Sequence, residues 1–116
     1  MRIAFGIMGG FNQAQAHAQF VSNVADFGMN IQAALEAARF TKGTFAGCDV
    51  DFEDRIPPEV RAALAARGHQ IRVDGDYSSR MGSGQATERN FATGVNFGAS
   101  DPRKDGEAIP EPLPLR

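Results

Sequence analysis

The sequence predicts a mixed α/β domain of roughly five strands and three helices. Short apolar runs that end in glycines or turn residues indicate the strands, and segments with apolar residues three and four positions apart indicate the helices. A length of 116 residues is enough for at most one small domain. Hydrophobic residues make up 42% of the chain and charged residues 22%, which is typical of a soluble globular protein.

The N-terminal part predicts a strand followed by a helix. Residues 2–8 are largely apolar and lead into a pair of glycines, which is typical of a short strand. Asn12 is the predicted N-cap of a helix that runs to about Phe27, and Gly28 suits the left-handed position that ends a helix. The helix carries one apolar stripe, made of Phe20, Val24 and Phe27.

Two more helices and a strand are predicted in the middle of the chain. Asn30 is a suitable cap for a helix over residues 31–39. Residues 44–52 mix apolar and polar side chains and indicate a strand. Pro57 and Pro58 open a third helix, because proline in the first turn removes an N–H that has no helical partner.

The C-terminal half predicts a strand, a polar loop and a hairpin. The strand covers residues 70–73, and residues 74–83 form a loop rich in glycine and serine. Two further strands, residues 84–89 and 94–99, are predicted to pair around a turn at residues 90–93.

The strongest candidate for a functional site is the glycine pair Gly9-Gly10 at the junction between the first strand and the first helix. Two adjacent glycines let backbone N–H groups face a ligand with no Cβ in the way. Such a pair suits an oxyanion hole or an anion site at a helix N-terminus. The other interpretation is a tight turn with no chemical role.

Three other features each allow two interpretations. His17, in the first helix, is either a general base or a packing histidine. The segment Gly82-Ser83-Gly84 is either an anion-binding nest or a flexible turn. An acidic cluster indicates a solvated strand edge rather than a cation site, because it lacks the glycine and spacing of a calcium loop. Its members are Asp49, Asp51, Glu53 and Asp54.

Composition argues against several classes of function. A net charge of −2 gives no reason to expect nucleic acid or an anionic membrane as a partner. No apolar run approaches the ~20 residues that span a bilayer. The single cysteine, Cys48, excludes an internal disulfide and a multi-cysteine metal site. We predict that Cys48 is a small buried apolar residue rather than a reactive thiol.

Several sequence blocks resemble the C-terminal, small-subunit region of the gamma-glutamyltransferase (gamma-glutamyltranspeptidase) family. Residues 8–40, MGGFNQAQAHAQFVSNVADFGMNIQAALEAARF, are similar to the family's GG, QPQ and GMN-Q-A-APRF blocks. The similarity resumes at residues 66–69, ARGH, and at residues 98–103, GASDPR. The sequence departs from the family pattern at Ala14 and Ala38, where the family usually has proline.

The resemblance implies the four-layer αββα sandwich of the N-terminal nucleophile hydrolases, of which this chain would form a part. It implies acyl transfer or hydrolysis of gamma-glutamyl amides such as glutathione, through a threonine acyl-enzyme. The oxyanion-hole role would fall to Gly9 and Gly10, with no cofactor and no metal. Residues 1–105 would be the C-terminal part of such a domain, and residues 106–116 an irregular proline-rich tail.

The resemblance also implies a missing nucleophile, because the family's threonine lies upstream of these blocks and no residue here matches it. The isolated chain is therefore predicted to be inactive. It would need the segment or subunit with the threonine as a partner, or would associate with itself. The alternative is a stand-alone binding or interaction module that has lost catalysis. A soluble protein of the cytoplasm or periplasm is expected, and the sequence does not choose between these compartments.

Overall fold

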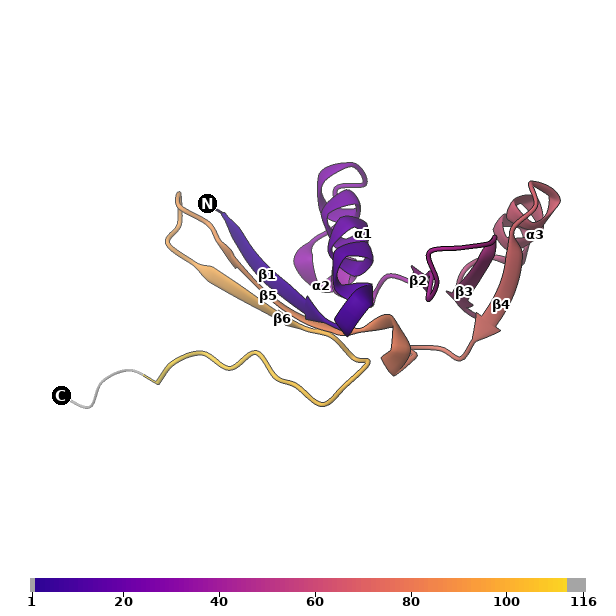
Figure 1. Cartoon of the computed structure of the whole chain (residues 1–116). Helices are drawn as coiled ribbons and strands as arrows, with labels where there is room; N and C mark the ends of the chain where they lie inside the picture. Colours follow the sequence, from indigo (N-terminus) through magenta and orange to yellow (C-terminus); the bar gives the residue numbers. More distant parts are fainter. Residues whose placement is uncertain (1, 113–116) are drawn as a thin grey trace.

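The computed structural model describes residues 2–112, which form three α-helices, two short 3₁₀ helices and six strands (Figure 1). The order is β1 (Ile3–Met8), η1 (Gly10–Asn12), α1 (Gln13–Ala25), α2 (Ile31–Glu36), β2 (Phe40–Thr41), β3 (Asp49–Glu53), α3 (Pro58–Ala66), β4 (Gln70–Asp74), η2 (Ser79–Met81), β5 (Ser83–Arg89) and β6 (Asn96–Ser100). No helix in this range is both long and apolar enough to cross a membrane.

The first sheet is antiparallel and has the strand order β1-β5-β6. Alternation along β1 places Ile7 in the core, while Gly6 and Met8 point to the other face and are exposed. Helices α1 and α2 pack on the inner face of this sheet (Figure 1). The core between them consists of Ile7, Ala16, Phe20, Ile31, Ala34, Leu35, Ala86 and Ala99.

The second sheet has the strand order β2-β3-β4. Strands β3 and β4 are parallel, and α3 forms the connection that parallel pairing requires. Strand β2 has two residues and pairs antiparallel with β3, through Phe40 with Phe52 and Thr41 with Asp51. The second sheet and α3 lie at the opposite end of the molecule from the N-terminal end of β1 (Figure 1).

The molecule is elongated. Its principal extents are 62 × 26 × 23 Å and its radius of gyration is 16.4 Å, whereas a compact domain of this length has a radius of about 13 Å. The accessible surface is 7788 Å², more than a quarter above the roughly 6,100 Å² expected for a compact monomer of this mass. The described chain therefore leaves an unusually large surface uncovered for its size.

Several sequence predictions about helix ends and the hairpin are confirmed. The Asn30 side chain accepts a hydrogen bond from the Ala33 N–H at 2.8 Å, as an N-cap does. Gly28 has a φ of 66°, the left-handed conformation predicted for it. The Pro57-Pro58 pair precedes and opens α3, and the hairpin around residues 90–93 joins β5 to β6.

Other predicted boundaries are wrong. Helix α1 ends at Ala25, and Phe27 lies beyond it with 72% of its surface exposed, so it is not part of the apolar stripe. Helix α2 ends at Glu36, three residues before the predicted end. The predicted strand over residues 44–52 is shifted, because residues 44–48 form an exposed loop before β3.

The predicted polar loop contains a buried residue, and so does the segment after β6. Met81, within residues 74–83, is fully buried in η2. Arg103, in a segment without helix or strand, is 5% exposed. Residues 104–112 contain no helix or strand, and the remainder of the predicted tail, residues 113–116, lies outside the described residues.

Candidate functional site

The Gly9-Gly10 pair lies in the turn that joins β1 to η1 and α1, and both residues are exposed. Gly9 has a φ of 150° and Gly10 a φ of 57°, conformations that favour glycine. The Gly9 carbonyl accepts a hydrogen bond from the Asn12 N–H at 3.0 Å. Within residues 2–112, the N–H groups of Gly9 and Gly10 donate no hydrogen bond. The turn thus presents two exposed, unused donors.

The Gly82-Ser83-Gly84 segment forms a wall beside this turn. Both glycines are buried, and a Cβ at Gly82 would collide with the Met8 carbonyl oxygen. A Cβ at Gly84 would lie 2.8 Å from Ile7 and 2.9 Å from Leu35. These glycines therefore allow close approach of β5 to β1 and α2. The burial of this segment argues against the flexible-turn interpretation.

Asn12 does not cap α1 as predicted. Its φ and ψ are −73° and −16°, and its side chain makes no cap hydrogen bond. The side chain is buried beside Gly9 and Gly82, and neither its Oδ1 nor its Nδ2 has a partner among the described residues. The early turn of η1 displaces Asn12 from the extended conformation that an N-cap requires.

His17 lies on the side of α1 that faces β1. Its Nε2 accepts a hydrogen bond from the Ile7 N–H at 2.9 Å. Its ring packs edge-on against Phe5, with 5.3 Å between ring centroids. His17 is thus half-buried and engaged with the backbone of β1, which supports the packing interpretation over the general base.

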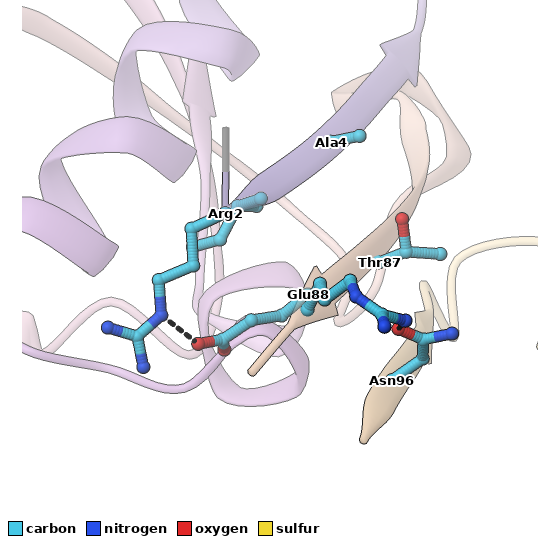
Figure 2. Close-up of a pocket in the computed structure, with 7 residues that line it drawn as sticks. Arg2, Ala4, Thr87, Glu88 and Asn96 are labelled. Carbon is cyan, nitrogen blue, oxygen red and sulfur yellow. Dashed lines mark hydrogen bonds and ion pairs between the residues drawn. The ribbon is translucent and has the colours of Figure 1, made fainter. Parts of the chain in front are cut away.

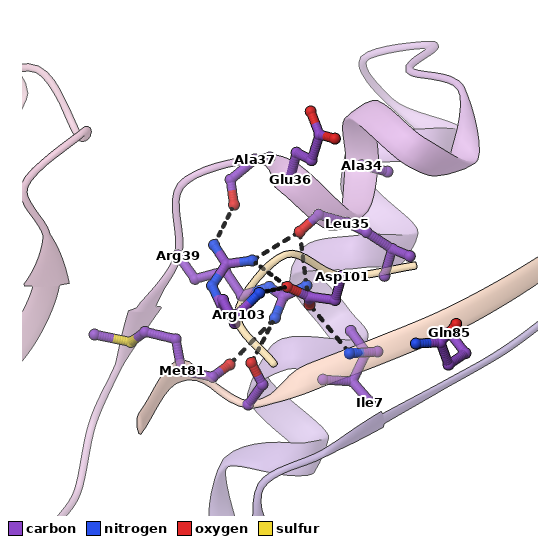
Figure 3. Close-up of polar contacts among 12 residues, drawn as sticks. Ile7, Ala34, Leu35, Glu36, Ala37, Arg39, Met81, Gln85, Asp101 and Arg103 are labelled. Atoms are coloured by element: carbon purple, nitrogen blue, oxygen red, sulfur yellow. Dashed lines mark hydrogen bonds and ion pairs between the residues drawn. The ribbon is translucent and has the colours of Figure 1, made fainter. Parts of the chain in front are cut away.

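Four charged residues form a buried network behind the turn, and Figure 3 shows three of them at its centre. Asp101 accepts from Arg39 at 2.7 Å and from Arg103 at 3.1 Å. Arg103 also donates two hydrogen bonds to Glu53, at 2.7 and 2.6 Å. The side chains of Glu53, Asp101 and Arg103 are completely buried. Each buried charge thus has at least one partner of opposite charge, and the partly exposed Arg55 adds a further contact to Glu53 at 3.0 Å, so the network tolerates burial.

Burial lowers the pKa of Arg39, and the like charge of Arg103 lowers it further. Burial acts in the same direction on Arg103, but its hydrogen bonds and ion pairs with Glu53 and Asp101 outweigh burial and raise its pKa. Both guanidinium groups stay charged, because an arginine pKa is far above neutral pH.

The network extends to the wall beside the glycine turn. The Arg39 guanidinium donates to the carbonyls of Met81 and Gly82 at 3.3 and 3.2 Å (Figure 3). Asp101 accepts from the Gly84 N–H at 3.1 Å. The conformation of residues 81–84, and with it the packing of Gly82 against Met8, therefore depends on two buried charges, Arg39 just before β2 and Asp101 just after β6.

Three glutamine side chains each form two hydrogen bonds with the backbone of one residue, one to its carbonyl and one from its N–H. A neighbouring strand would satisfy the same two groups. Gln15 donates to the Lys42 carbonyl and accepts from the Lys42 N–H. Gln19 does the same with Phe40 in β2, and Gln32 with Ser100 in β6. A primary amide has one donor and one acceptor side, so it satisfies both polar groups of a residue. These contacts join the helices to strands of both sheets.

Two sequence predictions near the second sheet are wrong. Asp51 and Glu53 are 3% and 0% exposed, so the acidic cluster is not a solvated strand edge. Cys48 is exposed rather than buried. Periodicity could not show the burial of the two carboxylates, because Arg72, which pairs with Asp51, and Arg103, which pairs with Glu53, lie 21 and 50 residues away in the sequence.

A surface depression lies at the far end of the first sheet (Figure 2). Arg2, Ala4, Thr87, Glu88 and Asn96 line it, together with Ile3 and Arg89. Its position is about five residues from the glycine turn along β1, or roughly 17 Å. Its polar side chains pair with each other, as Arg2 does with Glu88 at 3.0 Å. This depression is therefore separate from the glycine turn. Among the described residues, no group of three or more His, Cys, Asp or Glu side chains could hold a metal ion.

Two relatives with known assignments are similar to most of this chain. One is the glutathione hydrolase-like YwrD proenzyme of Bacillus subtilis, 31% identical over 111 residues, which are 93% of this chain and 21% of the relative. The other is the oxamate amidohydrolase proenzyme of Klebsiella pneumoniae, 32% identical over 109 residues, 91% of this chain and 20% of the relative. The chain thus spans about a fifth of the length of these relatives.

The fold is shared with solved structures of the same group. A cephalosporin acylase from Bacillus halodurans superposes with a TM-score of 0.85 at 43% identity, over 94% of this chain and 20% of that one. The architecture is part of the N-terminal nucleophile hydrolase fold, as the sequence predicts. The family profile of gamma-glutamyltranspeptidase matches residues 1–111. The chain therefore belongs to the gamma-glutamyltranspeptidase family.

Proposed function

We propose that this chain provides the oxyanion-stabilising part of an enzyme that transfers or hydrolyses gamma-glutamyl groups of amides such as glutathione. A threonine outside these 116 residues would attack the amide carbonyl carbon. Electrons of the C=O bond would move to oxygen, and the N–H groups of Gly9 and Gly10 would donate to that oxyanion. Collapse of the intermediate would break the C–N bond, and the amine would leave with the proton given up by the threonine hydroxyl. Water or an amino group would then attack the acyl-enzyme and return a proton to the threonine oxygen.

The observation that carries this proposal is the pair of exposed N–H groups at Gly9 and Gly10 that donate to no described residue. Fixed donors aimed at a developing negative charge need no reorganisation during the reaction. The turn is held on one side by Gly82 against Met8 and on the other by the start of α1. Both contacts support a fixed orientation of the donors.

The large uncovered surface supports the need for a further segment. The first sheet has an open edge at β1, because β5 is its only neighbour among the described strands. Phe11 beside the glycine pair is 89% exposed, and Phe45 in contact with it is 99% exposed. Apolar surface of this kind is typical of an interface. We infer that the segment with the nucleophile covers this region.

A Gly10→Val variant of the complete enzyme tests the proposal. Turnover should fall by about a hundredfold or more, because the side chain would displace or block one oxyanion donor. No atom outside the adjacent residues lies within 4 Å of an added Cβ at Gly10, so a clash inside this chain would not explain the loss. Steady-state kinetics on fully processed protein gives the measurement.

Gly28→Val is the matched control. Gly28 has a φ of 66°, close to the 57° of Gly10, and also has open space around its added Cβ. Both substitutions cause similar backbone strain, but only Gly10 lies in the proposed site. If the two variants were equally active, the glycine pair would be only a turn.

The isolated chain should not release amine from a gamma-glutamyl anilide, because amide attack requires an activated nucleophile. Release of the coloured amine is followed in a preparation free of other enzymes. Turnover that a single substitution in this chain abolishes would contradict the proposal. The chain would then contain its own nucleophile.

A further inference from the structure

The backbone of β1 has one N–H near the glycine turn that does not take part in the sheet. The Arg89 N–H donates to the Arg2 carbonyl at 2.8 Å. With the register of β1 and β5, this bond places the polar groups of Gly6 and Met8 toward β5. The N–H of Ile7 therefore points to the open edge of the sheet. His17 Nε2 accepts it at 2.9 Å.

This hydrogen bond closes a loop of the chain around the proposed oxyanion hole. Ile7 and His17 are ten positions apart, and Gly9 and Gly10 lie between them. The bond joins the end of β1 to the first turns of α1, so it fixes the two elements that flank the glycine turn. Phe5 packs edge-on against the imidazole and restricts its rotation.

We propose that His17 is a positioning residue that sets the orientation of the Gly9 and Gly10 N–H groups through its hydrogen bond from Ile7. The inference rests on the proposed function of the glycine pair. An imidazole accepts at Nε2 only when it is neutral and carries its proton on Nδ1. The proposal therefore requires one specific tautomer of His17, a property that a histidine serving only as packing volume does not need.

Two variants separate the effect of the hydrogen bond from that of the side-chain volume, and a third assigns the NMR signals. His17→Gln keeps an acceptor near the position of Nε2, whereas His17→Leu fills similar space without one. His69→Gln removes the second of the two histidines, which is exposed, and so assigns the remaining imidazole signals. Nitrogen-15 NMR of the full chain reports the tautomer, and amide hydrogen exchange reports Ile7, Gly9 and Gly10.

The expected results are an Nδ1–H tautomer of His17 and a slowly exchanging Ile7 amide. In His17→Leu, exchange at Ile7 should accelerate at least tenfold and the amide signals of Gly9 and Gly10 should shift. His17→Gln should restore both. An Nε2–H tautomer, or glycine signals that do not respond to His17→Leu, would overturn the proposal.

The catalytic consequence is measured in the complete enzyme. His17→Leu should lower kcat by about a hundredfold with little change in KM, because small misplacements of catalytic groups have effects of this size. His17→Gln should recover most of that loss. If the glycine signals respond to His17→Leu while kcat does not, the positioning holds and the oxyanion role of the glycines fails. If kcat falls equally in both variants, the hydrogen bond is not the cause.

Discussion

At the scale of single residues, the stability of this chain depends on charges that are buried and matched. Arg103 makes six hydrogen bonds through its side chain and backbone, to Glu53, Asp101, Leu35 and Ala37. Without Arg103, Asp101 would keep only Arg39 among the described residues, at 2.7 Å, and Glu53 only the partly exposed Arg55, at 3.0 Å. The cost then comes mainly from the partners that remain.

Arg103→Met should lower the free energy of unfolding by about 3–5 kcal/mol, because Glu53 and Asp101 would each lose a buried cation. Chemical denaturation followed by circular dichroism measures the change. Arg61→Met is the control, because its partner Asp54 is largely exposed and such pairs contribute about 0–1 kcal/mol. Equal effects of the two substitutions would mean that the buried network does not stabilise the fold.

At the scale of helices and strands, glutamine side chains hydrogen-bond to the backbone of neighbouring elements, although a sequence pattern would place such polar side chains in solvent. Gln32 on α2 pairs with both backbone polar groups of Ser100 in β6, at 3.0 and 3.1 Å. It also donates to Glu36 at 2.7 Å. The amide therefore joins α2 to the edge of the first sheet.

Gln32→Ala should destabilise the chain by about 1–3 kcal/mol, since the Ser100 N–H and carbonyl lose their partner. Gln32→Glu should be at least as harmful, because a carboxylate cannot donate to the Ser100 carbonyl and would face Glu36. Thermal unfolding of both variants, with the exposed Gln13→Ala as control, measures these effects. A stable Gln32→Glu protein would show that the donor side of the amide is unimportant.

Some features could be predicted because they depend on nearby residues, whereas others depend on partners far away in the sequence. Asn30 and Gly28 were predictable, because their signals depend on backbone within a few residues. Glu53 and Arg103 were not, because each needs the other and they are 50 positions apart. The exposed position of Gly9 and Gly10 follows from the strand-to-helix junction, whereas the wall at Gly82 depends on long-range pairing with Arg39.

At the scale of the whole molecule, the elongated shape and the open edge of β1 indicate an incomplete assembly. The outer face of the first sheet is exposed along β1, where Ala4, Gly6 and Met8 share it. An unpaired edge strand with an exposed face invites pairing with a second chain or segment. The proposed partner is the segment that contains the nucleophile.

The chain expressed alone should therefore self-associate, with a mass above the 12.4 kDa of one copy. Size-exclusion chromatography with light scattering measures the mass, and co-expression with an upstream segment should replace self-association with a defined complex. A monodisperse 12.4 kDa species that unfolds cooperatively would favour the stand-alone module instead.

The separation between Glu53 and Arg103 also has a kinetic consequence. Closing a loop of 50 residues carries an entropic cost that is repaid only after much of the chain is already ordered. We therefore expect the pair to form late during folding, after the transition state. Interactions that form after the transition state slow unfolding and leave the folding rate almost unchanged. On this expectation Arg103→Met should speed unfolding with little effect on the folding rate, which stopped-flow folding and unfolding kinetics would measure.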